Sequence, residues 1–431
     1  MLNIFNLTEK LQQCNTYIAR LEAQNDALRQ QAELAQKAHT ADSASRYEQR
    51  KEAFLRPIRE MTAYVDQTYE FRHNVVRDSY EMRRRADGGP WFPVDDRQLN
   101  TIMNQVQDEG HVYCLKSLVT QRIRSAMALD YHPVADYLAQ VRGTWDGNDR
   151  LDELACRVST GDYCRRLLPV WLRAMVAQWL SLDTIHANAV MLLLISPQQG
   201  LQKSTFLHQL LPEALEQYYT DDFALTTKGN AERKLVEFAI INIDEFDKLP
   251  VKKLPDLKTL MQTLRPSFVK AYKTNFNQLP RIASFVGTSN ERHVLTDRTG
   301  SRRFLIIEPD GPIDVDGIDH DQLYAQLIHE VETGARYWFT KDEEAEMQLA
   351  NQPYYRLTPL EQLFRQFFRR PENADEQYQS LSAAQIMEML RRHAPSLLRQ
   401  ESVTSFGRML TRLAIPRDHQ HLGNAYRVVA L

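Results

Sequence analysis

Residues 190–205 read VMLLLISPQQGLQKST, and this stretch decides the fold class. The apolar run Val190–Ile195 predicts a buried strand of a parallel sheet. A short loop follows and ends at Lys203, Ser204 and Thr205. This order is typical of a phosphate site, in which backbone N–H groups surround an anion, the lysine reaches the outer phosphates and a hydroxyl binds Mg²⁺.

The loop departs from the usual G-x-x-x-x-G-K-[ST] pattern. Pro197 and Gln202 stand at the two glycine positions, and Gly200 is the one glycine left inside the loop. By itself the stretch also fits a buried strand followed by a surface turn. If it is a nucleotide site, the residues expected to contact the nucleotide are Gln199, Gly200, Gln202, Lys203, Ser204 and Thr205.

A second motif follows about forty residues later, where residues 238–247 read FAIINIDEFD. The apolar run predicts another buried strand, and ligands bind at the carboxyl ends of such strands. Asp244 would then hold Mg²⁺, and Glu245 would polarise an attacking water. The alternative is a strand followed by a solvated acidic turn. Together, the two motifs favour an NTPase.

A third strand is predicted by IASFVGTSN at residues 282–290, which places Asn290 at the same sheet edge as Asp244. An amide there can orient the lytic water or contact the γ-phosphate. Residues 297–304 follow as DRTGSRRF. Arg302 and Arg303 either neutralise charge in phosphoryl transfer, as an arginine finger does, or are surface arginines.

The order of these motifs resembles the virulence-associated protein E family of phage and mobile-element ATPases. That family is similar to superfamily 3 helicases and phage primase–helicases within the AAA+ class. The likeness rests on HPVADYLAQVRGTWDGNDRL (132–151), SPQQGLQKSTF (196–206), INIDEFDK (241–248) and FVGTSNERHVLTDRTGSRRFL (285–305). It covers residues 60–430 and is strongest to the form found in gut Bacteroidetes mobile elements.

The resemblance implies a role for each matched residue. Lys203 and Ser204 match the phosphate-loop lysine and the Mg²⁺ hydroxyl, and Asp244 and Glu245 match the Walker B pair. Asn290 matches the sensor asparagine. The two arginines after the D-x-T-G turn, Arg302 and Arg303, match residues of which one acts on a neighbouring subunit. Gln202 departs from the pattern and puts the rate of turnover in doubt.

Composition agrees with a multidomain globular protein of 431 residues, 43% hydrophobic and 25% charged. No apolar run reaches membrane-span length, and the N-terminus does not resemble a signal peptide. The four cysteines lack metal-site spacing, so neither zinc nor disulfides are expected, and a reducing cytoplasm is the default location. No primase constellation precedes residue 150.

The net charge of −3 does not mark the whole chain as a nucleic-acid binder. Eight basic residues nevertheless gather in one stretch: Arg265, Lys270, Lys273, Arg281, Arg292, Arg298, Arg302 and Arg303. Within it, residues 267–276 alternate loosely, and superfamily 3 relatives carry a pore-lining hairpin here. Lys270, Tyr272 and Lys273 are therefore candidates for gripping single-stranded DNA, with a solvated strand face as the alternative.

The N-terminal residues 1–37 carry a heptad repeat at Ile4, Leu7, Leu11, Cys14, Ile18, Leu21, Asn25, Leu28, Ala32 and Ala35. This pattern predicts a two-stranded parallel coiled coil, in which Asn25 fixes the register. The alternative is an amphipathic helix that lies on its own ATPase domain. Residues 38–49 are small and polar and suggest a linker.

The rest of the chain divides into three predicted units. Residues 50–155 form a small helical accessory domain with strand-like alternation over 69–85, where Arg83–Arg85 either contact DNA or form a solvated turn. Residues 156–345 form an α/β P-loop core with helices on both faces of a parallel sheet. Its helix Tyr163–Ser181 carries Trp171 and Trp179 into the core.

Residues 355–431 predict a winged-helix-like domain. Helices are expected over Leu360–Arg370, Ser382–His393 and Phe406–Leu413, followed by a hairpin over Pro416–Val429. Arg408 and Arg412 lie on one side of the third helix, which in such domains enters the major groove of DNA or serves as a protein-docking surface.

The combined prediction is a Mg²⁺-dependent, DNA-dependent ATPase, either a ring-forming helicase or a translocase, for which the family implies a hexamer. A two-stranded heptad does not match six-fold symmetry, so the N-terminal helix would link rings or recruit another protein. Two rivals stay open: a nucleotide-binding switch with little hydrolysis, and a DNA-binding regulator with a vestigial ATPase.

Overall fold

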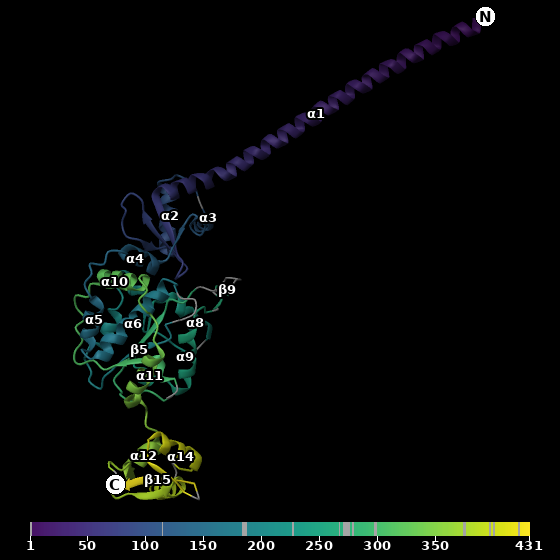
Figure 1. Ribbon diagram of the computed structural model, residues 1–431. Helices are drawn as coiled ribbons and strands as arrows, with labels where there is room; N and C mark the ends of the chain where they lie inside the picture. Colours follow the sequence, from purple (N-terminus) through teal and green to yellow (C-terminus); the bar gives the residue numbers. More distant parts are fainter. Residues whose placement is uncertain are drawn as a thin grey trace. The chain divides into compact units, whose positions relative to one another are not determined.

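The computed structural model describes residues 2–113, 115–182, 188–225, 228–266, 268–269, 276–277, 280–296, 300–373, 376–395, 398–399, 401–420 and 423–431. The chain divides into two compact units, residues 1–132 and 133–431. The boundary lies ahead of the predicted position at 156, because residues 133–158 pack with the second unit. Each unit is described by itself (Figure 1).

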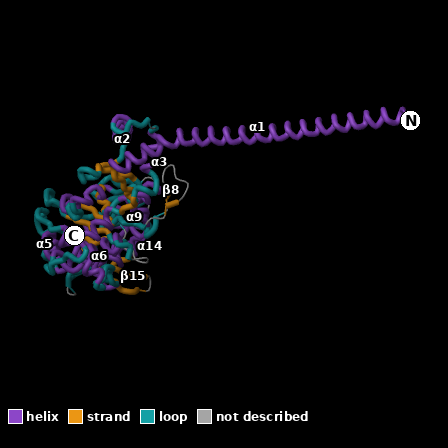
Figure 2. The backbone as a smooth tube through the Cα atoms, turned by 90° about the horizontal axis from the view of Figure 1, so that it is seen from above, coloured by secondary structure: helices purple, strands orange, loops and turns teal. Residues whose placement is uncertain are grey.

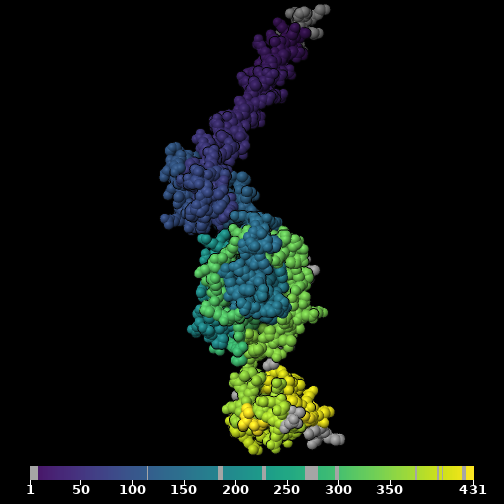
Figure 3. All heavy atoms as spheres, turned by 60° about the vertical axis from the view of Figure 1, so that its left-hand side comes forward, coloured from purple at the N-terminus to yellow at the C-terminus, as the bar shows by residue number. Residues whose placement is uncertain are grey.

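The first unit begins with one long helix, α1 (Leu2–Thr68), shown as a single continuous coil in Figure 2. Every residue from 8 to 54 is exposed, and this stretch carries its side chains into solvent in Figure 3. The predicted linker at 38–49 is wrong, because these residues are helical. They contain no glycine or proline, and small polar residues with alanine sustain a helix where no breaker intervenes.

The last turns of α1 pack on a four-stranded sheet of order β3-β2-β1-β4. The strand-like alternation noted over residues 69–85 corresponds to two of these strands, and the unit contains both helices and a sheet. Met61 and Val65 of α1 share a core with Ile102 and Val106 of α2. The elements are β1 (Tyr69–Asn74), β2 (Ser79–Arg84), β3 (Phe92–Pro93), α2 (Asp96–Asp108), α3 (Lys116–Ile123) and β4 (Leu129–Tyr131).

The second unit contains a five-stranded, all-parallel sheet of order β11-β5-β10-β7-β6, which confirms the predicted parallel α/β architecture. Its strands are β5 (Met191–Ile195), β6 (Tyr219–Thr220), β7 (Ile240–Ile243), β10 (Ser284–Ser289) and β11 (Phe304–Ile307). Figure 1 shows α5 (Arg150–Val158) and α6 (Asp162–Trp179) on one side of the sheet, and α8 (Lys228–Glu237) and α9 (Leu254–Gln262) on the other.

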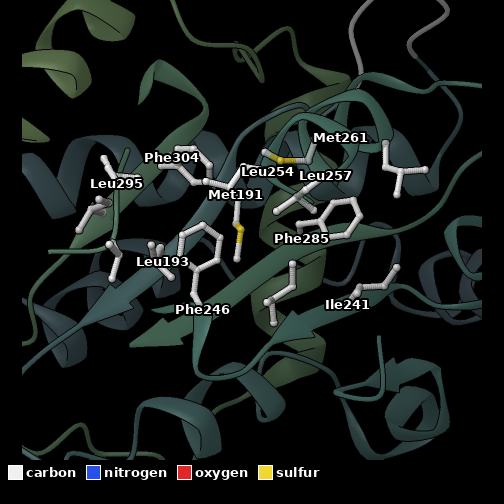
Figure 4. Packing of buried hydrophobic residues seen from close by; sticks show 14 of the residues in the cluster. Met191, Leu193, Ile241, Phe246, Leu254, Leu257, Met261, Phe285, Leu295 and Phe304 are labelled. Carbon is white, nitrogen blue, oxygen red and sulfur yellow. The ribbon is translucent and has the colours of Figure 1, made fainter. Parts of the chain in front are cut away.

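Alternating residues of the strands fill the core on the α8 and α9 side. Met191, Leu193 and Ile241 pack there against Leu257 and other apolar residues of α9 (Figure 4). Trp171 and Trp179 of α6 are buried, as predicted, and their indole N–H groups donate to Val190 O and Ile282 O. The sheet is therefore fixed from both sides.

Strand β10 lies between β5 and β7 and approaches both closely. A Cβ atom on Gly287 would lie 2.8 Å from Ile243 O and also collide with Met191 Cε. The remaining elements are α4 (Pro133–Val141), α7 (Lys203–His208), η1 (Glu213–Tyr218), η2 (Phe246–Lys248), η3 (Val251–Lys253), β8 (Phe268–Val269), β9 (Phe276–Asn277), η4 (Ser301–Arg303), α10 (His320–Glu332), α11 (Lys341–Ala350) and η5 (Gln352–Tyr354).

The C-terminal residues fold around a separate apolar cluster that includes Phe364, Leu390 and Phe406. The three predicted helices and the predicted hairpin are present. The elements are α12 (Pro359–Phe367), β12 (Phe368–Arg369), β13 (Gln379–Ser382), α13 (Ala383–His393), α14 (Val403–Arg412), β14 (Arg417–Gln420) and β15 (Gly423–Ala430). Strand β15 pairs antiparallel with β12, β13 and β14.

Candidate nucleotide site

Three strands of the parallel sheet end at one edge and bring the predicted site residues together. The register aligns Ser289 of β10 with Ile195 of β5, and Gly287 of β10 with Ile243 of β7. The polar residues that follow these strands therefore share the carboxyl edge of the sheet, where open α/β sheets bind ligands.

The loop that joins β5 to α7 contains two residues in left-handed backbone conformations. Gly200 has φ of 79°, and Gln202 has φ of 59° and ψ of 24°. A residue with a side chain pays roughly 1 kcal/mol for this conformation, which glycine adopts freely. The left-handed conformation at Gln202 explains why the usual pattern has glycine at this position. With glutamine there, the loop keeps the same turn, and its backbone is strained.

Lys203 lies buried at the centre of the site, with 7% of its surface exposed. Its Nζ donates to Asn290 Oδ1 at 2.8 Å and to the carbonyl oxygens of Ser196 at 3.2 Å and Gln198 at 3.4 Å. Desolvation lowers the pKa of Lys203, and the negative charge of Asp244 partly opposes that shift. The two residues predicted to face the γ-phosphate, Lys203 and Asn290, are thus in direct contact.

Asp244 accepts hydrogen bonds from two hydroxyls. Ser204 Oγ donates to Asp244 Oδ1 at 3.0 Å, and Thr288 Oγ1 donates to the same oxygen. A carboxylate and hydroxyls are the hard oxygen ligands that Mg²⁺ prefers. The donor set therefore fits a magnesium ion, and Thr288 is a member that was not predicted from the sequence.

Glu245 follows Asp244 in a left-handed conformation, with φ of 51°. Its carboxylate accepts a hydrogen bond of 2.6 Å from Lys248 Nζ, and both side chains are more than half exposed. This contact raises the pKa of Lys248. Lys248 lies in the INIDEFDK segment but had no assigned role, and the partner that it offers to Glu245 is visible only in the structure.

These residues line a pocket of about 410 Å³, within the range of small-molecule sites. Its lining includes the six residues predicted to contact the nucleotide, together with Asp244, Glu245 and Asn290, and adds Leu201 and Thr288. The full lining is Gln199, Gly200, Leu201, Gln202, Lys203, Ser204, Thr205, Asp244, Glu245, Thr288 and Asn290.

The two predicted finger arginines do not line this pocket. Arg302 Nη1 donates to Glu344 Oε2 of α11 at 2.9 Å, which ties η4 to that helix. The neighbouring Arg303 is half-buried and makes no side-chain hydrogen bond or ion pair to any residue that the structure describes. The two arginines therefore differ in their surroundings, although the sequence gives them equal standing.

The structure describes some of the basic residues discussed as a DNA-binding stretch and not others. Lys270, Tyr272 and Lys273 lie outside the described residues, although the flanking strands β8 and β9 pair antiparallel, as a hairpin requires. Arg281, one of the eight counted basic residues, is buried, with 2% of its surface exposed. Its guanidinium donates to the carbonyl oxygens of Asn188, Leu260, Met261 and Ala283, and burial lowers its pKa to about 9. Arg281 is therefore a structural residue of the core and does not contribute to a basic surface.

The two arginines of α14, Arg408 and Arg412, also differ in their surroundings. Arg408 is exposed, whereas Arg412 Nη2 donates to Glu361 Oε2 at 2.9 Å. The Glu361 carboxylate is fully buried and also accepts from Arg365 at 2.9 Å. Arg412 therefore joins α14 to α12 rather than standing free beside Arg408.

The segment 132–151 had no derivable chemistry, and the structure gives it a packing role against α10. Tyr137 OH donates to Asp321 Oδ1 at 2.9 Å, and the N–H of Asp146 donates to Gln322 Oε1 at 2.8 Å. The N–H of Arg150 donates to Gln326 Oε1 at 2.8 Å. Residues 132–151 are thus bonded to α10, whose residues come almost two hundred positions later in the chain.

Comparison with known proteins assigns a family to most of the second unit. A model of the virulence-associated protein E-like domain matches residues 138–356, just over half of the chain. A second model, described as a domain of unknown function from a B. Theta gene description, matches residues 357–428. The chain therefore belongs to the virulence-associated protein E-like family and carries a C-terminal domain of Bacteroidetes type, which confirms the predicted resemblance.

A search of curated proteins finds no match. Among solved structures, the apo structure of the NrS-1 C-terminal region is 12% identical, with a TM-score of 0.42, over 87% of this chain and 99% of that one. A structure titled "SCCmec type IV Cch - active helicase" is 8% identical, with a TM-score of 0.27, over 80% and 72%. Both TM-scores lie below 0.5, so the family assignment depends on the two sequence models.

Proposed function

We propose that this protein is a Mg²⁺-dependent ATP hydrolase that is stimulated by DNA. It would act as a ring-forming helicase or translocase in the replication or maintenance of a phage or mobile element, in the bacterial cytoplasm. The observation that carries the proposal is the cluster of Lys203, Ser204, Asp244 and Asn290 at one sheet edge. Its lysine–amide and hydroxyl–carboxylate contacts line one pocket.

The chemistry of each side chain suits one part of a triphosphate. Lys203 would move its ammonium from Asn290 to the outer phosphates, and Asn290 would then orient the attacking water. Ser204 and Asp244 would hold Mg²⁺, which when bound neutralises phosphate charge. Glu245 would polarise the water once its carboxylate leaves Lys248. In this scheme the loop from β5 is the P-loop, and residues 244–245 are the Walker B pair.

The positions of Arg302 and Arg303 support an oligomeric enzyme. Because neither lines the pocket of its own chain, an arginine that completes the site would come from a neighbouring subunit. We propose a ring, with the hexamer expected from the family resemblance. Single-stranded DNA would pass through its centre along Lys270, Tyr272 and Lys273.

The C-terminal domain supports DNA contact through a winged-helix arrangement. Its three helices and the β14–β15 hairpin have the required order, and α14 presents Arg408 on its exposed face. Residues 1–37 would associate as a coiled coil, with a second copy or with another protein. None of the described helices is both long and apolar enough to cross a membrane.

A second candidate function is a nucleotide-binding switch with little or no hydrolysis. The strained conformation of Gln202 favours it, because the Gln202 side chain occupies a position where glycine normally gives phosphates access to the backbone. The same pocket would bind nucleotide in both cases, and the two functions differ in turnover alone.

The deciding experiment measures ATP turnover with and without single-stranded DNA in wild type and in Glu245→Gln. Loss of the residue that polarises water should lower DNA-stimulated turnover about 100-fold or more, while binding of Mg-ATP persists. Glu213→Gln, an exposed substitution on η1, is the matched control and should leave turnover unchanged. Equal rates in wild type and Glu245→Gln would exclude the hydrolase and favour the switch.

A further inference from the structure

The short connector Tyr354–Arg356 joins the end of the family domain to the loop that follows β10. The N–H groups of Val294 and Leu295 both donate to Tyr354 O at 2.9 Å, and the N–H of Arg356 donates to Leu295 O at 2.7 Å. Leu295 and Tyr355 form a parallel β-bridge. The connector is thus bonded through its backbone to a segment that begins a few residues after Asn290.

The side chain of Arg356 extends this connection to the loop after β7. Its Nη2 donates to Asp247 O at 2.7 Å, and its Nε donates to His293 O at 3.1 Å. One half-buried guanidinium therefore joins the two loops that carry Glu245 and Asn290. Hydrogen bonds from a charged donor are stronger than those between neutral groups, so the loops are firmly held.

Asp247 is held on two sides. Ser289 Oγ donates to Asp247 Oδ1 at 2.7 Å, while Arg356 holds the Asp247 carbonyl. Ser289 directly precedes Asn290, whose amide oxygen accepts from Lys203. A continuous set of contacts therefore leads from Lys203 through Asn290, Ser289 and Asp247 to Arg356.

The chain beyond Arg356 leads directly into the C-terminal domain. The second family model begins at residue 357, and α12 begins at Pro359. Thr358 caps this helix by accepting a hydrogen bond from the N–H of Glu361. Only Leu357 and Thr358 separate the guanidinium-bearing residue from a helix, so little slack lies between them.

We propose that Arg356 is a positioning residue that couples the nucleotide site to the C-terminal domain. The inference rests on the proposed function, because it requires nucleotide to bind beside Lys203. When a triphosphate draws Lys203 away from Asn290, the loops after β7 and β10 shift, and Arg356 passes that shift to the start of α12. Hydrogen bonds and shared backbone link each residue of this set to the next, from Lys203 to Arg356, and the hydrogen-exchange experiment below tests whether they transmit the shift.

The test is amide hydrogen exchange of the full chain with and without saturating Mg²⁺ and a nonhydrolysable ATP analogue. In wild type, nucleotide should protect residues 196–206 and should also change exchange over 354–367. In Arg356→Ala, protection of 196–206 should persist, and the change over 359–367 should be lost. Arg173→Ala is the matched control, because Arg173 also donates to a backbone carbonyl, Arg336 O at 3.0 Å, away from the site.

The other outcomes distinguish failure of the proposed function from failure of the coupling through Arg356. If nucleotide fails to protect 196–206 in wild type, the proposed function is wrong, and the coupling falls with it. If 196–206 is protected but 354–367 never responds, or responds equally in Arg356→Ala, the coupling alone is wrong. If Arg356→Ala abolishes protection of 196–206 at saturation, or Arg173→Ala reproduces the effect on 359–367, Arg356 does not have the assigned role.

Discussion

Ser204 Oγ donates a hydrogen bond of 3.0 Å to Asp244 Oδ1, and so joins the start of α7 to the end of β7 across forty residues of sequence. Lys203 makes the equivalent connection to Asn290 beyond β10. The two contacts are adjacent, and together they tie three strand ends into one polar cluster.

Nucleotide affinity should fall in alkaline solution because of Lys203. Burial holds its pKa below the usual 10.5, and bound phosphate would raise the pKa again, so binding takes up protons. The affinity is therefore full below the lowered pKa and declines as pH rises through it toward the ordinary value. Titration of Mg-ATP analogue binding across this range measures the effect.

Lys203→Arg is the control for the alkaline decline, because a guanidinium stays charged throughout the range. If this variant still binds nucleotide, its affinity should be nearly independent of pH. An identical decline in wild type and Lys203→Arg would assign the titration to another group.

Arg303, rather than Arg302, should be the arginine that acts on a neighbouring subunit. Arg302 is engaged with Glu344, whereas Arg303 has no partner among the described residues. Arg303→Ala and Glu245→Gln should each be inactive alone, and mixing them should restore part of the DNA-stimulated turnover. The mixture creates interfaces that combine an intact Glu245 with an intact Arg303.

The matched mixture pairs Arg302→Ala with Glu245→Gln. Arg302→Ala should keep turnover by itself and lose mainly the bond between η4 and α11, so mixing should add nothing. Failure of the Arg303→Ala mixture to regain activity, in subunits that still assemble, would rule out action in trans.

Arg412→Ala should loosen the C-terminal domain, because it removes a guanidinium group that contacts the buried Glu361 carboxylate. Loss of a hydrogen bond to a charged group costs about 1–2 kcal/mol here, since Arg365 stays in place and Arg412 is partly exposed. Faster amide exchange in peptides from 359–412 would report this loss. Arg408→Ala should leave exchange unchanged and instead weaken DNA binding; the reverse pattern would contradict both assignments.

The heptad of α1 should bring two copies of Cys14 together. In a parallel, in-register pair, residues at the same core position face each other closely enough for a disulfide. Mild oxidation should therefore give a covalent dimer that Cys14→Ser abolishes. Gln13→Cys in the Cys14→Ser background moves the thiol off the core and should cross-link less. Exclusive monomer from the wild type would contradict the parallel pair.

The site was largely predictable because three apolar runs end directly in polar residues. Parallel strands place such ends at one edge, so Lys203, Asp244 and Asn290 could be brought together from their positions alone. Thr288 was missed because it belongs to the strand itself. Its contact with Asp244 depends on the register between β10 and β7, and a shift of one residue would point it to the other face.

Contacts between distant segments account for most of the errors. A local count of charge cannot separate a solvated arginine from a buried one, because the partners come from elsewhere in the chain. Arg281 donates to carbonyls as distant as Asn188, and Arg412 meets a carboxylate 51 residues away. The role of 132–151 against α10 was invisible for the same reason.

Gly287 contributes no functional group, yet the polar cluster depends on it. A methyl group there would lie 2.8 Å from the backbone carbonyl of Ile243 in β7 and would also displace the end of the Met191 side chain. Strands β7 and β10 would have to move apart, and with them the acids and the asparagine that follow these strands. The substitutions that this edge of the sheet accepts are therefore limited by the lack of room around the α-carbon of Gly287, as well as by the charges of the polar cluster.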